Sequence, residues 1–283
     1  MSSHQEDTRL FQGKDHSVTY QRYRPKYEGY NIVEKFMTFL QEQCPPPYQL
    51  ALDLGCGSGQ SAHLLASHFK EVIGMDCSEE QIKAAQGSST LTNVSFRCGD
   101  ESSLGSIQDG SVDLITCAQS IHWMDLDVLY KELDRILKPG GCLAAYGYHS
   151  NTVHVTDDQS ELETQLQDIV QEINDWIMPY WSEKINLIYS AYKDLPLPFT
   201  DNKRYVDEVK YQEMNAEGVF GLIESFSAYQ IAIKKHTDGT KRFRDYRRKF
   251  VDCIRKYCDQ PEEYKLKYSS NHFLVLSRKP ANK

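Results

Sequence analysis

The chain has 283 residues, of which 40% are hydrophobic and 25% are charged, and these proportions are typical of a folded globular protein. Its formal net charge of -8 argues against a general nucleic-acid-binding surface, because such surfaces need clustered Lys and Arg. No apolar run approaches the ~20 residues that cross a bilayer, and the polar start at 1–7 lacks the apolar segment of a signal peptide. We therefore expect a cytoplasmic protein, a monomer or weak dimer, that acts on a small molecule without nucleic acid or membrane as a partner.

The first predicted element in chain order is a helix at 30–43, where apolar residues recur at helical spacing until three consecutive prolines end the segment. A helix is also predicted at 126–137, followed by a Pro-Gly-Gly turn. Around this second helix, β-rich apolar runs alternate with helical stretches, which indicates a parallel sheet covered by helices. The predicted strands lie at 49–54, 71–75, 94–98, 112–118 and 142–146.

The second half of the chain interrupts this alternation. Residues 149–201 are predicted to be mainly helical, as an insertion or lid whose Trp176, Tyr180 and Trp181 either line a pocket or serve ordinary helix packing. Strand-like segments at 206–214 and 273–277 would complete the sheet, separated by a helix capped by Asn215 and a basic amphipathic stretch. That stretch, 241–256, is predicted to be a solvated helix face, with an acidic partner as the alternative.

The predicted architecture is a Rossmann-like, doubly wound α/β fold. Its sheet is seven-stranded and mostly parallel, with one antiparallel strand, an N-terminal helix and a helical insertion after the fifth strand. We divide the chain into an N-terminal segment covering a cofactor, a cofactor-binding core, the insertion, and a part that completes the sheet on the substrate side. These segments are 1–47, 48–148, 149–203 and 204–283.

The chain contains eight cysteines. Five of them lie in or beside apolar strand-like segments and are predicted to be reduced thiols that fill the core. The spacing of Cys253 and Cys258, with no matching His or Cys pair after them, does not suggest structural zinc, so no metal is expected. The five predicted core thiols are Cys56, Cys77, Cys98, Cys117 and Cys142.

A strand running into Gly55, Gly57 and Gly59 and then into a helix forms the most informative motif. Glycines let a ligand approach the backbone, and the N-terminus of the following helix presents free N–H groups. The third glycine comes one position too early for a dinucleotide site, where Gln60 would have to be glycine. Asp53, just before the loop, would crowd a pyrophosphate but attract an ammonium group, so the loop suits a zwitterion.

Acidic residues also follow the next two strands, at the edge of the sheet where open α/β folds bind ligands. Asp76 can accept hydrogen bonds from both hydroxyls of a ribose. Asp100 can accept from an exocyclic adenine amino group or cap the next helix. A nucleoside-containing ligand is therefore predicted.

These blocks, in this order, resemble the class I S-adenosylmethionine-dependent methyltransferases. The Asp-x-Gly-x-Gly-x-Gly loop at 53–59 resembles the family's first motif, Asp76 its ribose-binding acid, and Gly-Asp at 99–100 its adenine-side block. The segment 112–123 resembles its fourth-strand block, and 137–141 the turn before its fifth strand. The resemblance implies S-adenosyl-L-methionine as the cofactor, S-adenosyl-L-homocysteine as its product, and methyl transfer as the reaction.

Shorter pieces at 20–25, 122–123 and 224–229 resemble the trans-aconitate-methyltransferase-like branch of small-molecule enzymes. This resemblance implies that the N-terminal segment folds over the cofactor and that residues after the fourth strand lie near the methyl-transfer centre. The implied cofactor-binding residues are Tyr20, Arg24, Asp53, Gly55, Gly57, Gly59, Asp76, Cys77, Gln81, Asp100, Glu101, Gln119 and Ser120. The implied substrate-binding residues are Tyr23, His122 and Trp123.

Two questions stay open at this level. His122 is a candidate general base or a structural hydrogen-bonding residue, and Trp123 lines a pocket or belongs to the core. The acceptor of the methyl group is a small molecule, with a carboxylic acid as one candidate, because a carboxylate nucleophile needs no base. The alternatives are a non-catalytic S-adenosylmethionine-binding regulatory protein and, less favoured because of Gln60, an NAD(P)-dependent oxidoreductase.

Overall fold

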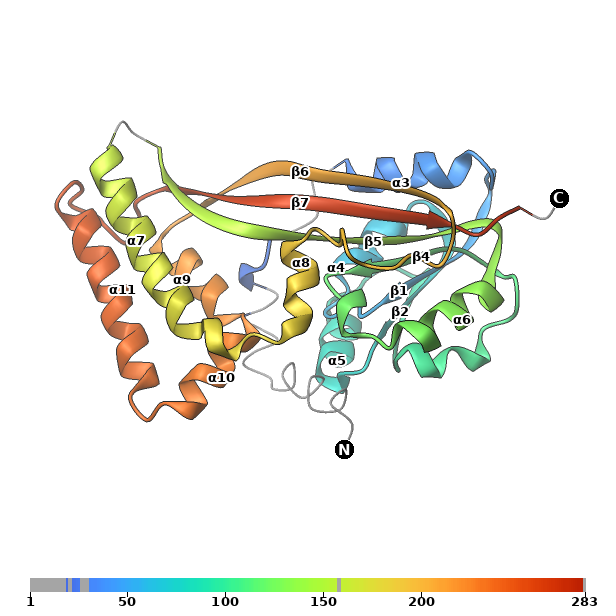
Figure 1. Cartoon of the computed structure of the whole chain (residues 1–283), viewed down its shortest axis with the longest axis horizontal. Helices are drawn as coiled ribbons and strands as arrows, with labels where there is room; N and C mark the ends of the chain where they lie inside the picture. The colour runs from blue at the N-terminus through green and yellow to red at the C-terminus, as the bar shows by residue number, and fades with distance from the viewer. Residues whose placement is uncertain (1–18, 20–21, 26–30, 157–158, 282–283) are drawn as a thin grey trace.

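The computed structural model describes residues 19, 22–25, 31–156 and 159–281. A seven-stranded sheet in the order β3-β2-β1-β4-β5-β7-β6 runs through it (Figure 1). β7 is antiparallel to both of its neighbours, whereas the other neighbouring pairs are parallel. The predicted fold class is therefore confirmed. The strands are β1 Tyr48–Leu54, β2 Phe69–Asp76, β3 Val94–Cys98, β4 Val112–Ala118, β5 Leu137–Val155, β6 Asp201–Met214 and β7 Leu266–Arg278.

Helices cover both faces of the sheet, each through its own buried apolar cluster. One face carries α3 (Ile32–Gln41), α4 (Gln60–Leu65) and α5 (Glu79–Ser88), whose apolar side chains pack on β1, β2 and β5. The other face carries α6 (Leu126–Ile136) and the short helix α8 (Asn186–Tyr189). Because both faces are covered, β1 and β4 are apolar along most of their length, as the sequence pattern predicted.

The last three strands are much longer than their apolar patterns predicted. β5 continues through 147–155, which the sequence assigned partly to the helical insertion, and pairs with β7 as far as Val155. The prediction of a short fifth strand was wrong. The extension of β5 is stabilised by hydrogen bonds to β7, which lies more than one hundred residues away in the chain. Such a long-range pairing leaves no periodic pattern in the sequence of the extension itself. The helical part of the insertion begins only at α7 (Ser160–Ile177).

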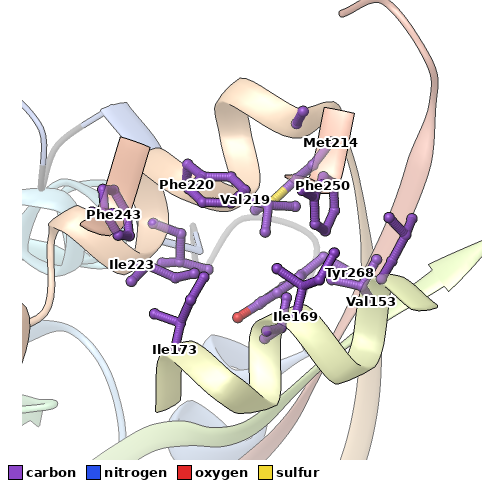
Figure 2. Close-up of a cluster of buried hydrophobic side chains, with 14 of the residues drawn as sticks. Val153, Ile169, Ile173, Met214, Val219, Phe220, Ile223, Phe243, Phe250 and Tyr268 are labelled. Carbon is purple, nitrogen blue, oxygen red and sulfur yellow. The ribbon is translucent and has the colours of Figure 1, made fainter. Parts of the chain in front are cut away.

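The extended ends of these strands support a group of helices that we call the helical lobe: α7, α9 (Ala216–Glu224), α10 (Ser227–Lys235) and α11 (Gly239–Arg255). They gather at one end of the molecule, away from β1 to β4 (Figure 1). Figure 2 shows their shared core, in which Ile169 and Ile173 of α7 face Phe220 of α9 and Phe250 of α11.

Two local predictions in this lobe are confirmed. The side chain of Asn215 accepts a hydrogen bond from the Gly218 amide and caps α9. The basic face of α11 is exposed and forms surface ion pairs, including Lys249 with Glu172 of α7, as expected for a solvated helix. No helix within the described ranges is long and apolar enough to cross a bilayer.

The cysteine prediction needs a correction. Cys56, Cys117 and Cys142 are buried as expected, but Cys77 and Cys98 are exposed. Cys98 is the last residue of β3 and Cys77 follows β2, so both lie at the carboxyl edge of the sheet, beyond the helices that cover its faces. The apolar runs in the sequence predict the strands, but they do not show where the helices that cover the sheet end.

Candidate functional site

The glycine loop joins β1 to α4. Gly55, Gly57 and Gly59 have φ angles of 68°, 52° and 89°, a region that side chains with a Cβ rarely adopt. A Cβ on Gly57 would meet only Gln81 Oε1, at 3.9 Å, so the backbone at this position borders open space. The Ser58 hydroxyl and Gln81 Oε1 are buried and have no hydrogen-bond partner within the described part of the chain.

Asp76, at the end of β2, holds this loop. Its Oδ2 accepts a hydrogen bond from the Gly57 amide at 2.9 Å, and its Oδ1 accepts one from the Ser78 amide at 2.9 Å. Burial raises the pKa of Asp76, while these two amides oppose that shift. Gln81 and Cys77, which the sequence analysis named as cofactor contacts near Asp76, differ in exposure. Gln81 is buried at the start of α5, and Cys77 is exposed.

Asp100 caps the 3₁₀ turn at Glu101–Ser106, because its Oδ1 accepts from the Ser102 amide at 3.0 Å. This is the capping role that the sequence left open beside an adenine contact. Glu101 is buried, and its Oε1 accepts from the Asp125 amide at 2.8 Å, which ties the turn after β3 to the start of α6. Both carboxylates thus organise the rim of the sheet.

Asp53 is fully buried at the end of β1, where its Oδ1 accepts from the Thr116 hydroxyl at 2.7 Å. Burial raises its pKa to about 6, against the lowering effect of the hydrogen bond from Thr116. The carboxyl group therefore changes charge close to neutral pH. Its position behind the loop allows it to influence the electrostatic potential at the glycines.

Gln119, Ser120, His122 and Trp123 follow β4. Gln119 has a φ of 54°, and its Nε2 donates to the Tyr148 carbonyl at 2.8 Å. His122 is buried, and its Nδ1 lies 2.9 Å from the Tyr192 hydroxyl. Burial, with a smaller effect of nearby Lys184, lowers the pKa of His122 to about 3. His122 is therefore neutral at physiological pH and a weak base.

The described part of the N-terminal segment binds to the helical lobe. The Tyr23 hydroxyl donates to Glu217 Oε1 at 2.7 Å, and its ring lies against Gly221, both on α9. The Arg24 guanidinium donates to the Ser225 carbonyl at 3.1 Å and to the Tyr148 hydroxyl at 3.4 Å. Tyr23 does not reach the cavity described next, whereas Arg24 does. Tyr20 lies outside the described residues.

A cavity of about 640 Å³ separates the carboxyl edge of the sheet from the helical lobe. Its wall on the sheet side includes Gln119, His122 and Trp123, and Arg24 lines it from the N-terminal segment. Trp181 also lines it, while Trp176 packs in the lobe core and does not. Sequence analysis missed several other lining residues, which belong to segments far apart in the chain: Tyr148, Thr152, Asn174, Asn186, Phe226 and Tyr268.

The glycine loop and its neighbours fit S-adenosylmethionine. The open space at Gly57 and the unpartnered buried polar atoms of Ser58 and Gln81 are what a polar ligand would occupy and satisfy. Asp76 and the exposed rim after β3 lie at the same carboxyl edge, where open α/β sheets bind ligands.

Comparison with known proteins supports the same conclusion. A methyltransferase domain family matches residues 52–145. A Dictyostelium discoideum protein proposed to be a methyltransferase is 31% identical over 220 residues, covering 77% of each chain. Trans-aconitate 2-methyltransferase of Deinococcus radiodurans is 35% identical over 127 residues, covering 42% of this chain and 47% of that enzyme. A solved type II methyltransferase candidate from Anaeromyxobacter dehalogenans, 24% identical, has the same fold, with a TM-score of 0.69 over 92% of this chain and 100% of that chain.

The chain belongs to the class I S-adenosylmethionine-dependent methyltransferases. Its cofactor is S-adenosylmethionine.

Proposed function

We propose that this protein transfers a methyl group from S-adenosylmethionine to a small-molecule acceptor bound in the 640 Å³ cavity. The observation that carries the proposal is the position of this cavity. Its wall begins at Gln119 and His122, which directly follow β4, and Ser120 between them packs against Gly55 of the cofactor loop. An acceptor in the cavity would thus lie beside the cofactor-binding loop, as methyl transfer requires.

The proposed cofactor contacts follow from the loop geometry. The backbone at Gly57 and the side chain of Gln81 border the space for the ligand, and Asp76 is the acceptor for the ribose. The cofactor supplies an electrophilic methyl group on sulfur. The other predicted contacts remain predictions, and Tyr20 among them lies outside the described residues: Tyr20, Arg24, Asp53, Cys77, Asp100, Glu101, Gln119 and Ser120.

A carboxylic acid is the acceptor class that we favour. Arg24 supplies a guanidinium at the cavity wall, in a position fixed by Ser225 and Tyr148. Guanidinium groups recognise carboxylates through paired hydrogen bonds. A carboxylate nucleophile also needs no base, which agrees with the low pKa of His122. The similarity to a trans-aconitate 2-methyltransferase favours the same class, although it covers less than half of either chain.

The helical lobe and the N-terminal segment would exclude water from the reaction. Trp181 and Phe226 supply apolar surface to the cavity, and Tyr23 and Arg24 attach the N-terminal segment to α9 and to the Ser225–Phe226 turn. Exclusion of water favours methyl transfer because it strengthens the electrostatic interactions in the site. A cytoplasmic location and a monomeric or weakly dimeric state remain predictions from the composition.

The decisive experiment is a screen for transfer of a labelled methyl group from S-adenosylmethionine to small carboxylic acids, phenols and amines. We expect turnover with at least one acid, and loss of turnover in a Gly57→Val variant that remains folded. Tight binding of S-adenosylhomocysteine with no transfer to any acceptor would favour the alternative of a non-catalytic cofactor-binding protein. That alternative is not favoured, because a cofactor-binding protein without an acceptor has no need of the 640 Å³ cavity beside the loop.

A further inference from the structure

The hydrogen bond between His122 and Tyr192 joins two buried rings. Tyr192 is 0% exposed and His122 is 4% exposed. The distance from His122 Nδ1 to the Tyr192 hydroxyl is 2.9 Å. Each group could in principle donate or accept, because neutral imidazole has one protonated and one unprotonated nitrogen and a phenol has both functions. The direction of this hydrogen bond decides what His122 offers to the cavity.

The phenol determines that direction. Its hydroxyl has one hydrogen, and within the described part of the chain Nδ1 of His122 is its one hydrogen-bond partner. If Nδ1 donated to Tyr192, the phenolic hydrogen would be buried without an acceptor, which is unfavourable. If Tyr192 donates, the hydrogen is satisfied, Nδ1 is the acceptor, and the imidazole proton must reside on Nε2. Burial, with a smaller effect of nearby Lys184, also lowers the pKa of His122 and keeps the ring neutral.

The backbone holds Tyr192 in place for this contact. Ala191 and Tyr192 have φ angles of 51° and 56°, although neither is glycine. Such conformations persist only where surrounding contacts enforce them. The Tyr192 amide donates to the Leu187 carbonyl at 2.7 Å, and Arg204 donates to the Tyr192 carbonyl. The strained turn thus directs the phenol into the core toward His122.

We propose that Tyr192 fixes His122 in the tautomer protonated on Nε2, so that His122 offers an N–H donor to an oxygen atom of the methyl acceptor. His122 lines the cavity, and its described hydrogen bond uses only Nδ1. Nε2 is therefore the polar atom left for a ligand. The role toward the acceptor rests on the proposed function, whereas the tautomer is a property of the protein alone. His122 then selects acceptors that carry a carbonyl or carboxylate oxygen and does not remove a proton.

A kinetic comparison tests the donor role. Glutamine can place an amide N–H near the position of Nε2, whereas alanine cannot. With the best acceptor from the methyl-transfer screen, His122→Ala is expected to raise KM about tenfold, and His122→Gln to raise it less than threefold. Equal KM values for the two variants would overturn the donor role. A wild-type kcat that rises with pH through a group assigned to His122 would also overturn it.

Nitrogen NMR of the full-length protein with labelled histidine tests the tautomer without cofactor or acceptor. In the wild type we expect protonation on Nε2, an unprotonated Nδ1 and no titration of His122 between pH 5 and 9.

Tyr192→Phe removes the donor and should shift His122 toward a mixture of both tautomers. Tyr130→Phe is the matched control, because the Tyr130 hydroxyl donates to the Pro196 carbonyl instead, and this variant should leave His122 unchanged. A proton on Nδ1 in the wild type, or an unchanged His122 in Tyr192→Phe, would overturn the proposal even if methyl transfer is found. The expected tautomer without any transfer would instead count against the proposed function.

Discussion

Ser120 lies directly against Gly55, and this contact joins the cofactor loop to the wall of the cavity. The Ser120 hydroxyl donates to the Leu54 carbonyl at 2.6 Å, and a Cβ added to Gly55 would lie 2.4 Å from the Ser120 Cβ. Gln119 before Ser120, and His122 and Trp123 after it, line the cavity, whereas Ile121 is buried in the core. The loop after β1 and the segment after β4 therefore form one packed unit, so a change in one is expected to be felt in the other.

Gly57→Ala should abolish binding of S-adenosylhomocysteine and leave the protein folded. The added Cβ has room in the protein itself, since only Gln81 Oε1 lies near it, but it would occupy the space for the ligand. Gly110→Ala is the matched control, because Gly110 has a similar φ of 59° and no neighbour within 4 Å of an added Cβ. Both variants should lose about 1 kcal/mol of stability from backbone strain. Only Gly57→Ala should lose the thermal stabilisation by S-adenosylhomocysteine, and equal stabilisation of both would refute the site.

Asp53→Asn should remove a pH dependence of stability. The folded pKa of Asp53, about 6, lies above the ordinary value of 3.8, so the native state binds more protons than the unfolded state between these values. The contribution of Asp53 to the free energy of unfolding therefore decreases by about 2 kcal/mol as pH rises from about 4 to about 6, and the full shift corresponds to about 3 kcal/mol over a wider pH range. Asparagine keeps the oxygen that accepts from Thr116. Denaturant unfolding at both pH values should show the wild type losing stability relative to Asp53→Asn, and parallel curves would contradict the assignment.

Gly221→Ala should weaken the attachment of the N-terminal segment to α9. A Cβ at this position would lie 2.4 Å from Tyr23 Cδ2, so the ring must move or the helix must shift, at a cost of about 1–3 kcal/mol. In a Tyr23→Ala background the same substitution should instead stabilise the protein by about 1 kcal/mol, because alanine favours helix over glycine. Thermal unfolding of the wild type, Gly221→Ala, Tyr23→Ala and the double variant measures whether the effect of Gly221→Ala on stability changes sign. Destabilisation in both backgrounds would show that Tyr23 is not the obstacle.

Arg24→Ala should raise KM for carboxylate acceptors by about 10- to 100-fold, as expected for loss of a hydrogen bond to a charged group. Arg22→Ala is the control, because Arg22 is 65% exposed and pairs with Glu217 on the surface. The comparison that matters is between an acid and its neutral amide in the same assay. Arg24→Ala should reduce the preference for the acid, and an unchanged preference would assign Arg24 a purely structural role through Ser225 and Tyr148.

Hydrogen exchange should show which segments close over the site. S-adenosylhomocysteine is expected to slow exchange in the N-terminal segment around Arg24, and a methyl acceptor should slow it further in 160–189, where α7 and Trp181 border the cavity. No residue of α11 lines the cavity, so α11 provides the internal comparison. Protection limited to the loops after β1, β2 and β3 would mean that neither segment closes the site.

The sequence alone predicted the features that depend on local pattern. β3 and β4 begin and end where their apolar runs do, and α6 ends one residue before its predicted boundary. The glycine loop, Asp76 and Gln119 were recognisable because their chemistry follows directly after predicted strands. The sequence shows these features because each of them depends on one strand and on the few residues that directly follow it.

Only the tertiary structure showed the cavity and its chemistry. Tyr148, Trp181 and Phe226 meet there because β5 and β7 pair far beyond their apolar cores and carry the helical lobe over the sheet edge. The contact of Tyr192 with His122 depends on a strained turn seventy residues after the histidine, and no local motif predicts it. Long strand pairings and buried hydrogen bonds gain their free energy from partners distant in sequence. The sequence therefore determined the cofactor, whereas the three-dimensional fold decided the cavity in which we propose that the acceptor binds.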